Sequence, residues 1–198
     1  MTKNIFNPTP KNEAMSQGSR LAGSAKGRAE NDFYPTPNWG TESLMKVELF
    51  SGITGEPACG DGAMSKVLEA HGLNVISTDL IYRGYGVGGI DFLTSDMPPC
   101  NNIITNPPFY CAKEFVEKSK NVATDKIAML LKTVFLETSD RYDMFQDTVF
   151  PLARVYQFSR RLTLWRNGIV GKNGGTAAYA WFVWDKKHIG APTIHWIK

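Results

Sequence analysis

The chain has 198 residues, of which 42% are hydrophobic and 21% are charged, and its formal net charge is +3. This composition predicts one compact domain with a core, and it excludes a membrane protein because no apolar run is long enough to span a bilayer. The three cysteines leave an odd thiol and show no metal-ligand spacing, which excludes a disulfide scaffold. We therefore expect a cytoplasmic protein without a metal site.

Charge is distributed unevenly along the chain. Residues 1–30 carry five Lys or Arg against two acids, residues 31–149 carry nine against sixteen, and residues 150–198 carry eight against one. An acidic middle with basic ends suits a fold that binds a cationic ligand at its centre and meets a polyanion at its ends. The alternative is that the basic ends are merely solvated.

Residues 1–31 lack apolar periodicity and predict a disordered basic tail, which either follows a polyanion or has no role. A single folded domain is expected over residues 32–198. In Tyr34-Pro35-Thr36-Pro37, Thr36 is a natural helix N-cap and Pro37 suits the first helical position, so a helix is expected to start there.

The next informative stretch, residues 55–64, reads as a strand end, a glycine turn and the start of a helix. Gly60 and Gly62 allow a ligand to approach the backbone closely. Such a turn also suits dinucleotides, but Glu56 and Asp61 place carboxylates where a pyrophosphate would lie. Their negative charge repels phosphate and favours a cationic ligand.

A second strand, residues 74–78, ends at Asp79, eighteen residues after Asp61. This is close to the spacing at which an acid binds ribose hydroxyls in nucleotide-binding α/β units, so Asp79 is the candidate ribose ligand. The glycine-rich segment 83–89 is expected to be a mobile loop, and it leads to Asp91 and Phe92.

The central motif is Asn106-Pro107-Pro108-Phe109, which follows the apolar residues Ile103 and Ile104 of an expected buried strand. The exocyclic amine of a heteroaromatic base is hardly nucleophilic, because its lone pair is delocalised into the ring. If the Asn106 side-chain oxygen and the Pro107 carbonyl each accept one amine hydrogen, the nitrogen becomes more tetrahedral and its lone pair points at an electrophile. Phe109 offers a face on which the base can stack.

Over residues 32–185, these motifs and their order resemble the S-adenosylmethionine-dependent amino-methyltransferases. The similarity is greatest to the DNA adenine-N6 enzymes of the phage and prophage type, in the gamma order of motifs. The resemblance implies a bacterial or phage-infected host cell and the cofactor S-adenosylmethionine. It implies cofactor contacts from Tyr34, Thr36, Pro37, Glu56, Ala58, Cys59, Gly60, Asp61, Asp79, Asp91, Phe92 and Asn106. The implied catalytic residues are Asn106, Pro107, Pro108 and Phe109.

Pro98-Pro99-Cys100 raises a second chemistry, because Pro-Cys carries the nucleophile of cytosine-C5 methyltransferases. That nucleophile follows the fourth strand, whereas Cys100 precedes it, at the end of the sheet away from the cofactor. Direct transfer to an amine also needs no covalent cysteine. We therefore expect Cys100 to be a small buried residue.

The rest of the chain predicts a helix over residues 112–119, a buried strand over 126–131, a short helix over 139–147, and strands over 155–158 and 177–184 that pair antiparallel. A basic hairpin at about 159–175 lies between the last two strands. It carries Arg160, Arg161, Trp165, Arg166 and Lys172, a set suited to phosphate contacts and base stacking. The alternative is a basic surface hairpin without a partner.

Together these features predict a Rossmann-like methyltransferase fold of three α/β/α layers, with a mostly parallel sheet and an antiparallel edge pair. The expected activity is methyl transfer to adenine N6 in DNA, with the base flipped out of the helix. The rivals are cytosine N4, adenine in RNA, a protein glutamine, and a catalytically silent nucleic-acid-binding protein. No separate recognition domain follows the motifs, so a partner protein could supply sequence recognition.

Overall fold

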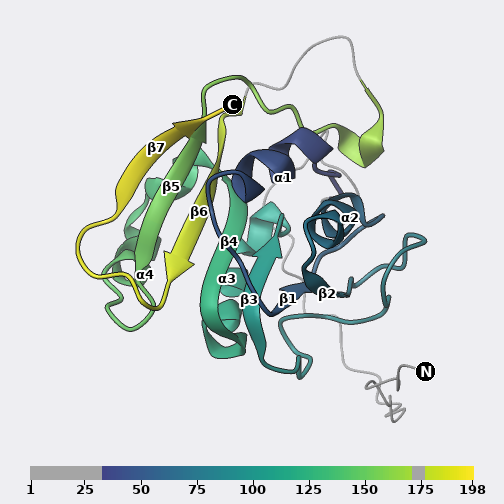
Figure 1. Ribbon diagram of the computed structural model, residues 1–198, viewed down its shortest axis with the longest axis horizontal. Helices are drawn as coiled ribbons and strands as arrows, with labels where there is room; N and C mark the ends of the chain where they lie inside the picture. The colour runs from purple at the N-terminus through teal and green to yellow at the C-terminus, as the bar shows by residue number, and fades with distance from the viewer. Residues whose placement is uncertain (1–32, 171–176) are drawn as a thin grey trace.

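The computed structural model describes residues 33–170 and 177–198, and Figure 1 shows how their helices and strands are arranged. The expected tail, residues 1–31, and Lys172 of the basic hairpin lie outside the described residues. Within the described ranges, no helix has the length and apolar composition needed to cross a membrane.

One seven-stranded sheet forms the centre of the described part of the chain. Its strands are β1 (Ile53–Glu56), β2 (Asn74–Ser77), β3 (Cys100–Thr105), β4 (Ala123–Lys132), β5 (Leu152–Phe158), β6 (Tyr179–Asp185) and β7 (Thr193–Ile197). The α-helices are α1 (Asn38–Met45), α2 (Ala63–Ala70), α3 (Ala112–Val122) and α4 (Tyr142–Phe145). Short 3-10 helices are η2 (Phe109–Cys111), η3 (Thr133–Leu136), η4 (Ser139–Arg141) and η5 (Arg166–Gly168).

The strands lie in the order β2-β1-β3-β4-β6-β5-β7. Neighbouring strands are parallel except at β6, which runs antiparallel to both β4 and β5. The expected three-layer α/β/α fold with a mostly parallel sheet and an antiparallel pair is thereby confirmed. The outermost strand, β7, was not expected. Four of its five residues are exposed, the apolar Ile194 and Trp196 among them, so this strand contributes little to the core.

Helices α1 and α2 cover one face of the sheet, and α3 and α4 cover the other (Figure 1). Strand β4 serves both layers because side chains alternate across a strand. Its residues Met129 and Leu131 pack with α3, whereas Leu130 packs with α1 and α2. Both faces of the central strands are therefore buried, which is the usual setting of a parallel sheet.

The carboxyl ends of β1, β2 and β3 meet at one edge of the sheet, because these three strands run parallel. That edge receives the turn after Glu56, the residues after Thr78, and the turn that begins at Asn106. Strand β6 runs the other way, so its first residue, Tyr179, lies at this same edge. In open α/β sheets ligands bind at the carboxyl edge.

The entrance to α1 differs from the expectation. The helix begins at Asn38, Pro37 precedes it with an extended ψ of 138°, and no described side chain caps it. Thr36 is buried and is not the N-cap. Its hydroxyl accepts a hydrogen bond from the side chain of Asn106, which lies seventy residues further along the chain. The predicted cap was wrong because a tertiary contact takes up that hydroxyl.

A partly buried ionic cluster ties the segment after α1 to the sheet. The Arg154 guanidinium lies 3.0 Å from the Glu48 carboxylate and 2.7 Å from that of Asp185. Lys126 adds a longer contact to Glu48, at 3.5 Å. Because the Glu48 side chain is only 6% exposed, its charge depends on these partners rather than on water.

A second buried network joins β1, α2 and β2. The Ser65 hydroxyl donates to the Glu56 carboxyl group, and the Ser65 and Ser77 hydroxyl oxygens lie 2.6 Å apart. Burial raises the pKa of Glu56 to about 8, although the hydrogen bond from Ser65 opposes the rise. At neutral pH this carboxyl group therefore holds its proton.

Replacing Arg154 with Met should lower the free energy of unfolding by about 3–5 kcal/mol, because it leaves the buried Glu48 and Asp185 carboxylates without their main partner. Urea denaturation measures this loss. Lys187→Met is the matched control, since it breaks an ion pair whose lysine is 80% exposed. Equal losses in the two variants would contradict the importance of the cluster.

Glu56 makes stability depend on pH in a defined direction. Between its ordinary pKa and about 8, the folded chain holds a proton that the unfolded chain releases, so stability should fall as pH rises through this window. Glu56→Gln should remove that loss. Denaturation at pH 5, 6.5 and 8 should therefore show that the free energy of unfolding of the variant rises relative to that of the wild type as pH increases. A difference that stays constant or falls with pH would refute the buried proton.

Candidate active site

A pocket opens at the carboxyl edge of the sheet, between the segment 33–36 and the turns after β1, β2 and β3. It brings together most of the residues predicted to bind a cofactor: Tyr34, Thr36, Glu56, Ala58, Cys59, Gly60, Asp61, Asp79, Asp91, Phe92 and Asn106. Pro108 of the predicted catalytic turn also lines it. Pro37, Pro107 and Phe109 lie outside its lining.

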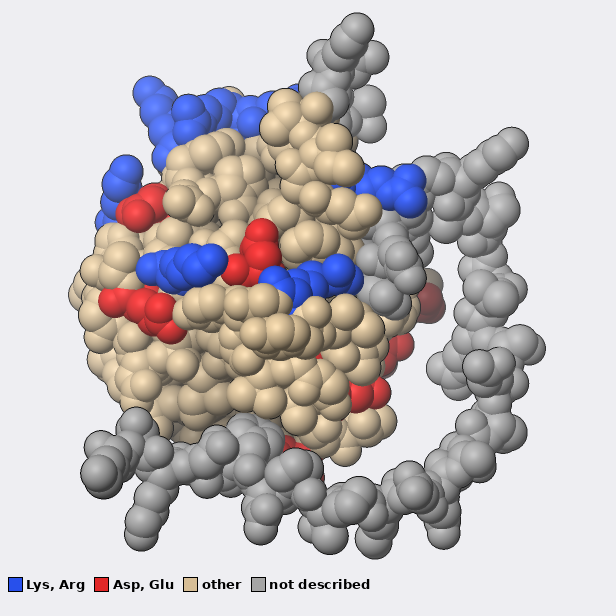
Figure 2. All heavy atoms as spheres, turned by 90° about the vertical axis from the view of Figure 1, so that its right-hand side faces the viewer, with Lys and Arg blue, Asp and Glu red and all other residues tan. Residues whose placement is uncertain are grey.

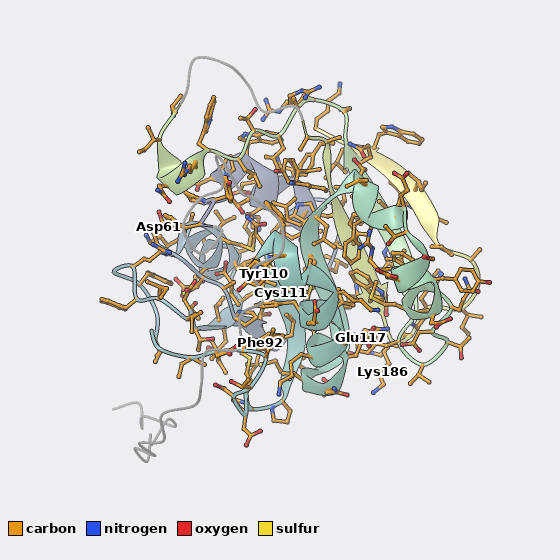
Figure 3. The ribbon with its side chains drawn as sticks, turned by 180° about the vertical axis from the view of Figure 1, so that it is seen from behind. Asp61, Phe92, Tyr110, Cys111, Glu117 and Lys186 are labelled. Atoms are coloured by element: carbon orange, nitrogen blue, oxygen red, sulfur yellow. The ribbon has the colours of Figure 1, made fainter. Side chains whose placement is uncertain are left out.

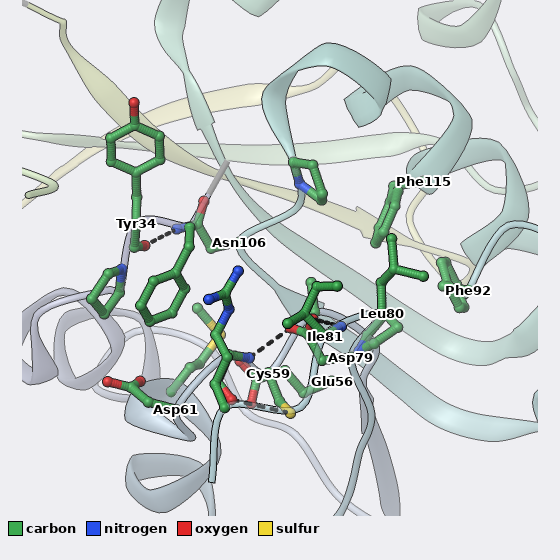
Figure 4. A pocket seen from close by; sticks show the side chains of 18 of the residues that line it. Tyr34, Glu56, Cys59, Asp61, Asp79, Leu80, Ile81, Phe92, Asn106 and Phe115 are labelled. Carbon is green, nitrogen blue, oxygen red and sulfur yellow. Dashed lines mark hydrogen bonds between the residues drawn. The ribbon is translucent and has the colours of Figure 1, made fainter. Parts of the chain in front are cut away.

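The pocket has two chemically distinct ends, as Figure 4 shows. Asn106, Tyr34 and Asp61 lie at one end, and Phe92 and Phe115 lie at the other, with Asp79 between them. The Phe92 and Phe115 ring centroids are 5.0 Å apart. The site can therefore hold an elongated ligand with a charged end and a flat apolar end.

Asp79 is fixed by two backbone hydrogen bonds. One carboxylate oxygen accepts from the Gly60 N–H at 2.8 Å, and the other accepts from the Ile81 N–H at 2.8 Å. Gly60 has a φ of +56°, and a β-carbon there would lie 2.7 Å from the Phe33 ring. A carboxylate has about four acceptor positions, so Asp79 can still accept hydrogen bonds from ligand hydroxyls.

The other two acids near the pocket are held differently. Asp91 accepts a hydrogen bond from the Leu93 N–H at 3.0 Å, and Asp61 accepts from the Ala63 N–H at 3.2 Å. Glu56 lines the pocket but is 2% exposed and bonded to Ser65. Asp61 is therefore better placed than Glu56 to meet a cation that enters from solvent.

The side chain of Asn106 is oriented by the segment before α1. Its Nδ2 donates to the Tyr34 carbonyl at 3.0 Å and to the Thr36 hydroxyl at 3.2 Å. A carbonyl can only accept, so the amide nitrogen must face Tyr34. The Asn106 Oδ1 atom is buried and has no hydrogen-bond partner among the described residues. A buried acceptor in this state is ready for a donor on a ligand.

Phe109 lies beside the pocket within an aromatic group. Its ring centroid is 5.9 Å from that of Tyr34 and 5.9 Å from that of Tyr179. The ammonium of Lys132 lies 4.8 Å from the Phe109 centroid. Two rings and a cation thus surround the residue that the motif assigns to base stacking.

The predicted basic hairpin is the connection between β5 and β6. Residues 159–170 form a loop that contains η5. This loop packs on residues 33–36, the segment before α1 that hydrogen-bonds the Asn106 side chain. The Arg160 guanidinium lies 3.7 Å above the Trp39 ring, and the Asn167 N–H donates to the Phe33 carbonyl at 3.0 Å. Arg161 and Arg166 are exposed, whereas Trp165 is partly buried.

The sequence reasoning missed several residues of the pocket. Leu80 and Ile81 directly follow Asp79 and line the pocket, although they are 50% and 38% exposed. Two large apolar residues after an acid at a strand end are a usable signal for a flat apolar ligand. Phe33, Arg83, Tyr110 and Phe115 also line it, and Figure 3 shows Tyr110 and Cys111 on the same side of the molecule as Asp61 and Phe92.

Cys100 lies at the start of β3 with 1% of its surface exposed. It is therefore at the edge opposite the pocket, which confirms that it is a buried residue away from the site. Across residues 33–170 and 177–198, no three His, Cys, Asp or Glu side chains are grouped so that they could hold a metal ion.

No protein-family model matches the sequence, and no curated protein matches it significantly. Solved structures do resemble the fold. A Listeria monocytogenes protein assigned to the class I S-adenosylmethionine-dependent methyltransferases has a TM-score of 0.60 and 15% identity, over 86% of this chain and 67% of its own. Magnesium protoporphyrin IX methyltransferase from Synechocystis PCC 6803, with bound S-adenosylmethionine, has a TM-score of 0.55 and 13% identity. That match covers 76% of this chain and 79% of the methyltransferase.

The M protein of the type I restriction enzyme EcoKI is also similar, with a TM-score of 0.57 and 14% identity. The match covers 83% of this chain and 48% of the M protein, so the chain spans about half the length of that relative. These likenesses concern the arrangement of the helices and strands. The chain has the Rossmann-like fold of the class I S-adenosylmethionine-dependent methyltransferases.

Proposed function

We propose that this protein transfers a methyl group from S-adenosylmethionine to the exocyclic N6 amine of adenine in DNA. The observation that carries the proposal is the buried Asn106 Oδ1, which lacks a hydrogen-bond partner among the described residues while both protons of the same amide are bonded. A lone acceptor of this kind fits an amine donor. It lies where the pocket meets the aromatic group around Phe109.

The chemistry of the pocket suits the cofactor. Asp79 would accept hydrogen bonds from the ribose hydroxyls, and Asp61 would lie near the cationic methionine end of the cofactor. A pyrophosphate would not fit beside Asp61, because both are negatively charged. Phe92 and Leu80 would contact the adenine ring, with Asp91 near its amino group. When bound, the cofactor supplies an electrophilic methyl group on a sulfonium.

Asn106 would act on the substrate nitrogen. Its Oδ1 and the Pro107 carbonyl accept the two amine hydrogens, so the nitrogen lone pair is directed at the methyl carbon. Asp61 and Asp79 would hold the cofactor, which would supply the methyl carbon to this nitrogen while the C–S electron pair stays on sulfur, and the extra amine proton would leave to solvent. Thr36 and Tyr34 act as positioning residues because they hold the amide in the required orientation.

Charge and aromatic side chains support nucleic acid as the substrate. Lys and Arg side chains occupy mainly the upper half of the face in Figure 2, toward the end of the molecule that carries the loop 159–170 in Figure 1. Phe109 provides the stacking surface that a flipped base needs. The EcoKI M protein belongs to a restriction enzyme, so this fold does occur in a DNA-modifying system.

The test is methyl transfer from labelled S-adenosylmethionine to DNA, RNA and protein in parallel, followed by digestion of the products. The proposal predicts N6-methyladenine in DNA. Label on cytosine N4, on RNA or on a glutamine side chain would show that the substrate is not adenine in DNA, but it would still support methyl transfer to a nitrogen atom. Binding of DNA without any transfer would instead favour a catalytically silent nucleic-acid-binding protein.

Asn106→Ala should lower the methyl-transfer rate by roughly 10²–10³-fold, because it removes a preorganised acceptor at the reacting nitrogen. The dissociation constant of S-adenosylmethionine should be nearly unchanged, and calorimetry measures it alongside the single-turnover rate. Cys100→Ser is the control and should be nearly silent. Near-normal turnover in the Asn106 variant would rule out the mechanism.

Arg160 and Arg161 should each contribute about −0.9 to the slope of log affinity against log salt on duplex DNA. Neutralising both to Gln should therefore flatten the slope by about 2. Lys186→Gln with Lys187→Gln provides a control of equal charge, because these lysines follow the last residue of β6 at the opposite edge of the sheet. An unchanged slope in the arginine variant would remove the loop from the DNA interface.

A further inference from the structure

Lys132 occupies a distinctive place beside the candidate site. It is the last residue of β4, at the same edge of the sheet as Asn106, and it pairs in register with Tyr179, the first residue of β6. Its ammonium lies 4.8 Å from the centroid of the Phe109 ring, and Tyr179 flanks that ring at 5.9 Å. A positive charge therefore borders the surface on which the target base would stack.

No acidic side chain of residues 33–170 or 177–198 balances this charge. Lys120, Lys126 and Lys187 each lie within 4.0 Å of a carboxylate, whereas Lys132 makes no ion pair with any described residue. It is also partly buried, so water compensates it less completely than an exposed lysine. The cation–π contact with Phe109 stabilises the ammonium but does not neutralise its charge. An anion from outside the chain is the natural partner.

The neighbouring strand ends extend this feature along the edge of the sheet. Adjacent strands lie about 4.8 Å apart, so the end of β5 lies about 10 Å from the end of β4, with Tyr179 of β6 between them. A small hollow at the end of β5 is lined by Gln157, Ser159, Arg160, Arg161 and Tyr179. A separation of about 10 Å is large enough for Lys132 and the two arginines to contact different phosphates of one strand, since successive phosphates already rise by about 3.4 Å along the axis of B-form DNA.

We propose that Lys132 is a positioning residue that binds the backbone phosphate next to the target nucleotide, and that Arg160 and Arg161 bind phosphates further along the same strand. Fixing that phosphate holds the flipped base against Phe109, with Tyr179 as the far wall of the base site. The proposal rests on the proposed function. It adds the direction of the substrate strand, from the turn after β3 toward the end of β5.

Three variants test the role of Lys132. Lys132→Gln should raise the KM for DNA by roughly 10-fold and reduce the salt slope by about 0.9, while the dissociation constant of S-adenosylmethionine stays unchanged. Lys132→Arg should restore most of the loss because it keeps the charge. Lys186→Gln, at the far edge of the sheet and well away from Tyr110 in Figure 3, should change neither quantity.

A chemical change in the substrate identifies the phosphate. A neutral methylphosphonate placed next to the target adenine should weaken DNA binding by the wild type as much as Lys132→Gln weakens binding of unmodified DNA. The two changes together should lower the affinity no more than either change alone. The same substitution several nucleotides away should add fully to the Lys132→Gln loss. The first pattern is the signature of a direct contact between the lysine and that phosphate.

Additive losses at every phosphate, or an unchanged KM in Lys132→Gln, would show that the lysine only supports the Phe109 ring. That result would leave the proposed function intact, because the wild type would still methylate DNA. A wild type that neither binds nor methylates DNA would overturn the proposed function and this inference together. Salt-dependent affinity and turnover of the wild type therefore separate the two failures.

Discussion

The fixed orientation of the Asn106 amide is the constraint on which the rest of the site depends. Two hydrogen bonds, to the Tyr34 carbonyl and the Thr36 hydroxyl, turn the amide nitrogen toward the segment before α1. The amide oxygen therefore points away from that segment, and no described residue donates a hydrogen bond to it. A side chain that could otherwise rotate is held ready to accept a hydrogen bond, so the proposed transfer would require little reorganisation of this amide.

The same short segment links the cofactor pocket to the basic loop. Residues 33–36 line the pocket, and the carbonyl of Phe33 accepts a hydrogen bond from Asn167 of the loop. Leu162 of that loop is buried and lies against Gly40 of α1. The residues proposed to meet the cofactor, to orient the catalytic amide and to face nucleic acid are thus packed into one layer above the carboxyl edge of the sheet.

Much of this arrangement could be read from the sequence because its signals are local. Residue type and spacing predict the turn after β1, with Gly60 and Asp61, and the acid at the end of β2, Asp79. They predict the turn at Asn106 as well, since Pro107 ends a strand that has two β-branched apolar residues. Parallel strands then bring the three turns to one edge.

The features that escaped prediction depend on contacts between distant parts of the chain. Thr36 looked like a helix cap because its bond to Asn106 spans seventy residues and leaves no local trace. Lys132 carried no motif, and its position beside Phe109 follows only from the order of the strands. Strand β7 buries only Ile197, so its place in the sheet rests on backbone pairing with β5, about forty residues earlier in the chain, rather than on core packing.

A crystal structure of the ternary complex with S-adenosylhomocysteine and adenine-containing DNA tests the central claim most directly. The account predicts the target adenine flipped onto Phe109, with its N6 about 2.9 Å from the Asn106 Oδ1 atom, the usual length of an N–H···O bond. Asn106 should keep its bonds to Tyr34 and Thr36. A bound adenine whose N6 lies beyond hydrogen-bonding distance of that oxygen would contradict the account.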